Sequence, residues 1–185
     1  MYKRVIFLSF LWMMAACYVH GETKKAYERI FYTPKSALSA VFPYASRIEP
    51  KSAIFTHHQQ DQIEAELGMK IDFQDINIHT AYNNQGQENG RAYILNELGK
   101  HYPITLIVKI LPEGVVGDVK VMAYRERVGG QIRKKRFLNQ FMGKSADATL
   151  RVNQDIDGIT GATISSWSVS KAVKKALVIH KWLSM

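Results

Sequence analysis

The sequence is almost free of cysteine, because Cys17 is the only one among 185 residues. A lone cysteine cannot form a disulfide within the chain, and Cys17 lies in a segment that we expect to be removed on export. The mature protein would then have no disulfide, no thiolate zinc site and no cysteine nucleophile. The 46% of residues that are apolar must hold the fold together, and the length is that of one ordinary domain.

Long apolar runs are also scarce. The run at the N-terminus, residues 5–19, follows a short basic start and is too short for a membrane span. This pattern predicts a secretory signal peptide over residues 1–21, with cleavage before Glu22, and therefore a bacterial periplasmic protein. A lipoprotein site, in which Cys17 becomes the lipidated first residue, is the alternative. Simple cleavage is favoured because methionine at the first position of that site is unusual.

Acidic side chains are in the minority, with 16 Asp and Glu against 25 Lys and Arg, and the formal net charge is +9. Removal of the leader would lower this charge by only two. A basic cluster inside a cell would indicate nucleic acid as a partner, but a signal peptide argues against that partner. The cluster could be a solvated basic face or a surface that steers an acidic partner. Its members are Arg125, Arg127, Arg133, Lys134, Lys135 and Arg136.

Hydrophobic periodicity predicts an α+β fold, with a mainly antiparallel, twisted sheet and packed helices. In the clearest strand, residues 104–110, alternate aliphatic side chains point one way, and a Pro-Glu-Gly turn joins it to a second strand over 115–124. Hairpins rather than βαβ units favour this class. Other strands are expected over 47–55, 76–82 and 91–95, and helices over 34–41, after a capping box at Thr56, over 133–141 and over 167–183. On the last helix four lysines should face water: Lys171, Lys174, Lys175 and Lys181.

The most informative segment runs from Asp157 to Ser166 and places small and hydroxyl side chains in a turn before the last predicted helix. The unpaired N–H groups and partial positive charge of a helix N-terminus favour phosphate. Gly161 and Ala162 would let the backbone approach a ligand closely, and Thr163 would present its hydroxyl there. From the residues alone, a glycine turn with a Ser/Thr helix cap is the commoner explanation.

The segment resembles the flavinylation motif of the FMN-binding domain family, Asp-x-x-Ser/Thr-Gly-Ala-Thr. Asp157, Thr160, Gly161, Ala162 and Thr163 fill every specified position. The family includes the covalent-FMN subunits of the sodium-pumping NADH:quinone oxidoreductase and of the Rnf complex. The resemblance implies that FMN is attached to Thr163 through a phosphoester bond, by a flavin transferase that uses FAD.

The resemblance extends from about residue 102 to residue 177. It includes the hairpin, Glu126 just after it, and a Phe-x-x-Gln-Phe-x-Gly-Lys segment that ends at Lys144. The family's loop after the second strand usually contains proline, whereas this chain has Glu-Arg-Val-Gly-Gly. We therefore expect residues 100–185 to form the FMN-binding core and residues 22–99 to be an N-terminal part of the same domain.

Each candidate cofactor-binding residue also has a plainer interpretation. Glu126 could contact the flavin edge or the motif turn, or be an exposed charge. Lys144 could neutralise phosphate or be solvated. Thr160 could bind phosphate or only backbone, and Asp157 could aid recognition by the transferase or form an Asx turn. The neighbours Ile164 and Ser165 complete the set, and Ser165 and Ser166 are the rival acceptors of FMN.

Three aromatic side chains, Tyr124, Phe137 and Phe141, could flank the flavin ring, although core packing is the commoner role for each. Trp167 could contact the ring as well. The pair His57-His58 indicates surface histidines rather than a metal site, since sequence neighbours point to different helix faces.

The function implied by the resemblance is an exported electron-transfer flavoprotein, more an electron carrier than a stand-alone enzyme. Its partners would be the flavin transferase and a redox partner, such as a cytochrome or a membrane quinone-linked complex, with peripheral membrane association as an added option. The basic cluster could then balance the charge of the phosphate and of reduced flavin. The alternatives are a periplasmic flavin-dependent reductase and a non-redox binding module that has kept the fold.

Overall fold

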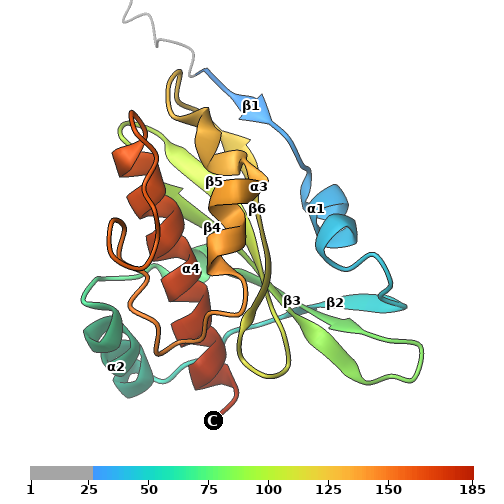
Figure 1. Cartoon of the computed structure of the whole chain (residues 1–185). Helices are drawn as coiled ribbons and strands as arrows, with labels where there is room; N and C mark the ends of the chain where they lie inside the picture. The colour runs from blue at the N-terminus through green and yellow to red at the C-terminus, as the bar shows by residue number, and fades with distance from the viewer. Residues whose placement is uncertain (1–26) are drawn as a thin grey trace, which may run out of the picture.

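The computed structural model describes residues 27–185, so the predicted signal peptide and Cys17 lie outside the described residues. A six-stranded antiparallel sheet forms the centre of the molecule, with the strand order β1-β6-β5-β4-β3-β2 (Figure 1). This arrangement, with helices packed on it, confirms the predicted α+β class. The strands are β1 (Arg29–Ile30), β2 (Arg47–Lys51), β3 (Asn77–Tyr82), β4 (Glu88–Leu98), β5 (Pro103–Ile110) and β6 (Val116–Tyr124).

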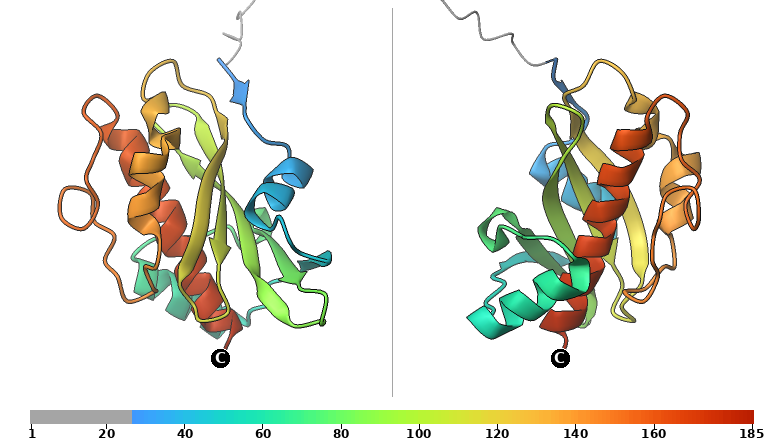
Figure 2. Two further views of the ribbon diagram at one scale, coloured as in Figure 1. Left: turned by 45° about the vertical axis from the view of Figure 1, so that its right-hand side comes forward. Right: turned by 90° about the vertical axis from the view of Figure 1, so that its left-hand side faces the viewer.

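Helices cover both faces of the sheet (Figure 2). The helices α2 (His57–Leu67), α3 (Lys135–Leu138) and α4 (Thr163–Leu183) lie on one face, and α1 (Pro34–Val41) lies on the other. Short 3₁₀ turns complete the secondary structure, at Phe73–Asp75, Gly130–Arg133 and Asn139–Phe141. Within residues 27–185, no helix combines the length and the apolarity that crossing a membrane requires.

The sheet therefore has two hydrophobic cores. The alternating residues Ile104, Leu106, Val108 and Ile110 are fully buried in the larger core, which α4 covers. The intervening Ile107 is equally buried but belongs to the smaller core, with Val41 of α1 and its neighbours. Burial on both faces explains why apolar residues run almost continuously through β5.

Two predicted strands have different lengths in the structure. The strand expected over 47–55 stops at Lys51, because its pairing with β3 ends at the Lys51–Ile78 pair, and Ile54 beyond it is 86% exposed. The strand expected over 91–95 extends over Glu88–Leu98, because β4 pairs with β3 on one side and along most of its length with β5 on the other. Backbone pairing with neighbours, which a single sequence does not show, decides both lengths.

The predicted helices also differ in their bounds. The capping box expected at Thr56 is present at the start of α2, and the helix ends at a left-handed C-cap, Gly68. The helix expected over 133–141 is only one α-helical turn, α3, between two 3₁₀ turns. The last helix begins at Thr163, four residues earlier than expected, so the motif itself supplies its first turn.

Two of the four lysines expected to face water on α4 are instead packed against the protein. Lys175 forms an ion pair with Glu97 of β4, with 2.7 Å between Nζ and Oε2 and both side chains less than 15% exposed. Lys174 donates hydrogen bonds to the carbonyl oxygens of Ala146 and Ala148. These contacts fasten α4 to the sheet and to the loop that precedes the motif.

Candidate flavin site

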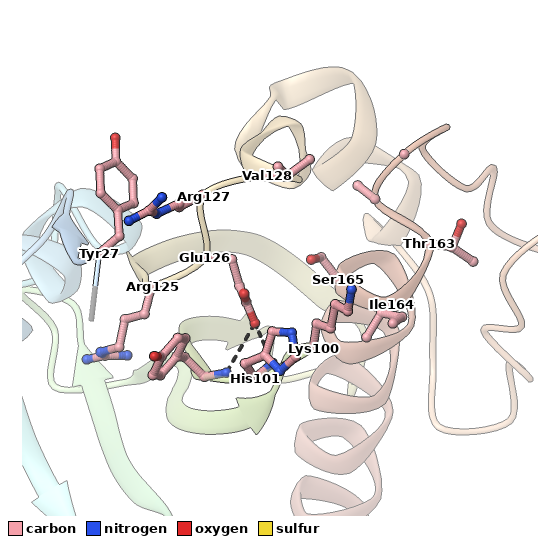
Figure 3. A pocket seen from close by; sticks show the side chains of 13 residues that line it. Tyr27, Lys100, His101, Arg125, Glu126, Arg127, Val128, Thr163, Ile164 and Ser165 are labelled. Carbon is pink, nitrogen blue, oxygen red and sulfur yellow. Dashed lines mark hydrogen bonds between the residues drawn. The ribbon is translucent and has the colours of Figure 1, made fainter. Parts of the chain in front are cut away.

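The candidate site is a pocket of about 720 Å³ at the end of the sheet where α4 begins. Four chain segments meet there: the residue Tyr27 just before β1, the β4–β5 turn, the loop after β6 and the first turn of α4 (Figure 3). The volume is in the range of small-molecule and cofactor sites. The lining residues are Tyr27, Lys100, His101, Tyr102, Arg125, Glu126, Arg127, Val128, Gly161, Ala162, Thr163, Ile164 and Ser165.

The first turn of α4 lines this pocket and carries backbone N–H groups that have no carbonyl partner among residues 27–185. Gly161 adopts a left-handed conformation (φ 76°), and Ala162 occupies the N-cap position without a side-chain hydrogen bond to the helix. Ser166 is the first residue of the helix whose N–H reaches a carbonyl, that of Ala162, at 2.8 Å. The earlier N–H groups and the positive end of a 21-residue helix therefore make the turn suitable for an anion.

The hydroxyl groups of this turn are not equivalent. The buried Ser165 side chain is 3.0 Å from the Tyr124 hydroxyl, and Ser166, with no exposed surface, donates to the Ala162 carbonyl at 3.0 Å. Ser166 Oγ also accepts the N–H of Ile159, at 3.3 Å. Thr163 is exposed and lines the pocket. Thr163 is thus the hydroxyl in the first turn that an external group can reach.

The loop after β6 is bound to the same turn through Tyr124. The Tyr124 hydroxyl donates to the Val128 carbonyl at 2.5 Å, which leaves the Ser165 hydroxyl to donate to the Tyr124 oxygen. Burial raises the pKa of Tyr124, with the nearby Glu126 carboxylate acting in the same direction, so the tyrosine stays protonated. This pair of hydrogen bonds sets the position of the loop that, in the family, usually contains proline.

Glu126 is 9% exposed, so the interpretation as an exposed charge is wrong. Its Oε1 accepts the backbone N–H groups of His101, at 2.6 Å, and of Tyr102, at 3.1 Å. The carboxylate thus holds the β4–β5 turn rather than the motif turn, while its side chain lines the pocket (Figure 3). Glu126 fixes the backbone from which Lys100 reaches the site.

Positive charge predominates around the pocket. Arg125 is neutralised by Glu28, 2.8 Å away, and also donates to the carbonyl of Pro103. Among residues 27–185, neither Lys100 nor Arg127 forms an ion pair. In Figure 3 Lys100 lies beside the first turn of α4, and Arg127 points toward Tyr27 on the other side. The pocket can therefore accept an anionic ligand at both ends.

Several predicted residues lie elsewhere. Lys144 does not line the pocket, because its carbonyl pairs with the N–H of Val116, at the opposite end of β6. Asp157 and Thr160 also lie outside the lining. The Asp157 backbone makes two hydrogen bonds with the Gln140 amide, so the Phe-x-x-Gln-Phe segment orients the start of the motif. Gly161, Ala162, Ile164 and Ser165 do line the pocket with Thr163.

The aromatic residues suggested for the flavin ring belong to the core. Tyr124, Phe137 and Phe141 are at most 3% exposed, and the two phenylalanine rings pack edge-on with 5.6 Å between centroids. Trp167 is half exposed but lines a different hollow, between α2 and α4. In the described part of the chain, no three His, Cys, Asp or Glu side chains are grouped to hold a metal ion.

Sequence reasoning missed the pocket side chains of Tyr27, Lys100, His101 and Val128. The Gly-Lys-His turn between two predicted strands could have drawn attention to Lys100, because it precedes the strongest strand. No sequence pattern indicated Tyr27, because its position at the pocket depends on the two-residue pairing of β1 with β6.

A pocket at an open helix N-terminus, with cations at its rim and an accessible hydroxyl in the first helical turn, suits a phosphate-containing cofactor. Residues 99–178 match the model of the FMN-binding domain, the family that the motif predicted. The family match begins at residue 99, yet strands on both sides of that point form one sheet.

Two curated relatives are similar to this chain. One is the G subunit of the proton-translocating ferredoxin:NAD(+) oxidoreductase complex of Clostridium ljungdahlii, 36% identical over 95 residues, with 46% of this chain and 51% of the relative covered. The other is the G subunit of the ion-translocating oxidoreductase complex of Aliivibrio fischeri, 35% identical over 89 residues, with 42% of each chain covered. The chain thus spans about half of the relatives that it matches.

Proposed function

We propose that this protein is an exported electron-transfer flavoprotein that carries FMN through a phosphoester bond to Thr163. The FMN-binding domain and the relatives in ion-translocating oxidoreductases support the cofactor and its use in electron transport. The accessible Thr163 hydroxyl, next to two hydroxyls that are already hydrogen-bonded inside the protein, is the observation that carries the covalent attachment.

The residues of the pocket fit FMN. The phosphate would lie at the first turn of α4, where backbone N–H groups and the helix dipole stabilise negative charge. Lys100 lines the pocket beside this turn, and Arg127 lies on the other side of the pocket. When bound, FMN supplies the redox chemistry. A cation near the flavin stabilises the negative charge of its reduced form and so raises the reduction potential.

Attachment requires only the hydroxyl and an external donor. With FAD as the donor, the Thr163 oxygen forms the new phosphoester bond, the bond between the two phosphates of FAD breaks, AMP leaves and the hydroxyl proton is released. The resemblance to the family implies that a flavin transferase carries out this step. The exposed position of Thr163 at the pocket rim is compatible with access by such an enzyme.

The proposal places the protein outside the cytoplasm, exported through a signal peptide over residues 1–21. A tethered cofactor suits that location, because free FMN would be lost by diffusion. The relatives are subunits of oxidoreductase complexes, so a membrane-bound redox complex or a cytochrome is the kind of partner that we propose.

The attachment site can be tested with three variants of the full chain, co-expressed with a flavin transferase. Thr163→Val should abolish the fluorescent flavin band on a denaturing gel and the matching increase in intact mass. Ser165→Ala should keep the band, since Ser165 is buried. Thr149→Val is the matched control and should keep the band, because Thr149 is an exposed threonine outside the motif that does not line the pocket. Flavin retained by denatured Thr163→Val would refute the proposal.

A further inference from the structure

A groove of about 320 Å³ adjoins the flavin pocket and is lined by four cationic side chains. It lies between β1 and the loop after β6, and its cations are Arg29, Arg127, Arg133 and Lys134. We call this the basic groove. The rest of its lining consists of Val128, Gly129, Gly130 and Gln131, and no acidic side chain takes part.

The charges of the basic groove are not neutralised by the protein. None of its four cations forms an ion pair within residues 27–185, whereas the neighbouring Arg125 is paired with Glu28. The Nε of Arg29 is buried and has no hydrogen-bond partner. Four like charges in one concavity repel each other and focus a positive potential, which an anionic partner would relieve.

Two of these arginines are held in position by aromatic rings. The Arg133 guanidinium lies 5.0 Å from the ring centre of Phe31, and that of Arg29 lies 4.9 Å from the ring centre of Tyr27. Such contacts restrict the side chains before any partner binds, so less conformational entropy is lost on docking. The groove is thus more organised than a row of solvated lysines.

The basic groove and the flavin pocket share two residues, Arg127 and Val128. Val128 is 72% exposed, so an uncovered aliphatic side chain stands between the two hollows. Ile164, which lines the flavin pocket, is also half exposed. An apolar centre with arginines beside it is typical of protein interfaces.

We propose that the basic groove, with Val128 at its edge, is the docking surface for an acidic redox protein. A concave surface with an exposed aliphatic side chain at its edge suits the convex surface of a protein better than the plane of a membrane. That the partner carries electrons rests on the proposed function, because it depends on flavin in the adjoining pocket. That it is an acidic protein rests on the charges of the groove alone.

Two forms of one haem protein can serve as matched probes. Native cytochrome c is basic, and succinylation of its lysines makes it acidic while the haem is kept. Isothermal titration calorimetry with the flavinylated full chain should detect binding of the succinylated form at low ionic strength, with an affinity that decreases as salt screens the charges. The native form should bind at least about tenfold more weakly, because its charge is repelled by the groove.

A triple variant tests the location of the surface. Arg127→Gln, Arg133→Gln and Lys134→Gln together should weaken binding of the succinylated probe by about tenfold. The control triple variant, Lys51→Gln, Arg151→Gln and Lys171→Gln, removes the same charge from exposed residues elsewhere and should change it by less than about twofold. Equal weakening by both triple variants would overturn the proposal, because net charge alone would then explain binding.

Two further readouts separate the alternatives. Vesicles of anionic phospholipid should bind both triple variants equally. If the groove variant alone lost vesicle binding while its binding of the succinylated probe was unchanged, the groove would recognise lipid. That result would overturn the proposal. The flavin band on a denaturing gel reports the proposed function independently. Calorimetric binding needs no flavin, so the docking surface can be confirmed or refuted even if Thr163 is unmodified.

Discussion

At the scale of single residues, the site depends on which hydroxyl groups already form hydrogen bonds within the protein. Three hydroxyls follow one another closely in the first turn of α4, but the fold uses those of Ser165 and Ser166 and leaves that of Thr163 exposed. The Ser165 hydroxyl is engaged because the Tyr124 hydroxyl binds both Ser165 and the loop after β6. The proposed attachment to Thr163 would therefore be selective because of the surroundings, since the three hydroxyl groups are chemically alike.

Gly129 is the residue whose replacement should disturb this arrangement most directly. Its φ is +94°, and an added Cβ would lie 2.5 Å from the Tyr124 hydroxyl oxygen and 3.1 Å from Ser165 Oγ. We predict that Gly129→Ala lowers the free energy of unfolding by about 2–3 kcal/mol, measured by urea denaturation, because backbone strain and a steric clash add together.

Gly143→Ala is the control for this prediction. Gly143 has a similar left-handed φ of +71°, but an added Cβ would meet nothing within 4 Å. Only the backbone strain should remain, at about 1 kcal/mol. Similar losses for the two variants would mean that crowding at Tyr124 is unimportant.

At the scale of secondary-structure elements, the pocket is built where three segments are joined by a few polar contacts. The most specific is the carboxylate of Glu126, just after β6, which accepts two backbone N–H groups of the β4–β5 turn. The turn carries Lys100 and His101 into the lining of the pocket. A contact between elements thus controls the position of a charge near the proposed phosphate.

Glu126→Ala should release the β4–β5 turn. We expect amide hydrogen exchange at His101 and Tyr102 to become faster, and the free energy of unfolding to decrease by about 2 kcal/mol, because two backbone N–H groups lose a charged acceptor. Glu113→Ala, in the exposed β5–β6 turn, should change neither quantity. Unchanged exchange at His101 in Glu126→Ala would contradict the role given to the carboxylate.

The elements themselves could be predicted from the sequence where the pattern is local. The capping box at Thr56 and the alternation from Ile104 to Ile110 gave α2 and β5 nearly to the residue. The lengths of β2 and β4 could not be predicted, because they depend on strand partners distant in the chain. The start of α4 was placed too late, since a Gly-Ala-Thr sequence indicates a turn until packing is known.

The candidate site, too, could be predicted from the sequence only where the pattern is local. The motif identified Thr163 and its neighbours, and residues 161–165 do line one pocket. Lys144 is a candidate for the phosphate, or a solvated lysine, only through its place in a family pattern, and it lies at the far end of β6. Lys100 and Tyr27 were missed because only the folded sheet brings the β4–β5 turn and β1 to the first turn of α4.

At the scale of the whole molecule, a buried polar pair joins the sheet to the main helix. The Tyr93 hydroxyl of β4 is 2.9 Å from His180 Nδ1 of α4, and both residues are at most 4% exposed. Burial, with the nearby Arg91 guanidinium, lowers the pKa of His180 to about 4, while burial raises the pKa of Tyr93. Tyr93 therefore donates to a neutral histidine at neutral pH.

This pair predicts how stability depends on pH. An unfolded histidine binds a proton near pH 6.5, but folded His180 does so only near pH 4, so protons favour the unfolded state between these values. The titration of His180 therefore leaves the free energy of unfolding unaffected above pH 6.5 and decreases it as the pH falls from 6.5 toward 4. Between pH 7 and pH 5 we expect the free energy of unfolding to decrease by about 2 kcal/mol from this group.

His180→Asn isolates the effect, because an amide oxygen can accept the Tyr93 hydrogen bond but does not titrate. Urea denaturation at the two pH values should show a smaller decrease in the variant by about the same amount. The residual decrease would come from other groups, including His79, whose pKa burial also lowers. An identical pH dependence in the variant and the original protein would rule out His180 as its source.

The short strand β1 limits how far the flavin pocket can lie from any anchor near the N-terminus. Tyr27, just before β1, lines the flavin pocket, and only ten peptide bonds separate it from Cys17. Ten fully extended residues reach at most about 35 Å, little more than the thickness of a bilayer's hydrocarbon core. Were Cys17 acylated, the pocket would stay within that distance of the lipid, and the protein would diffuse in two dimensions along the membrane.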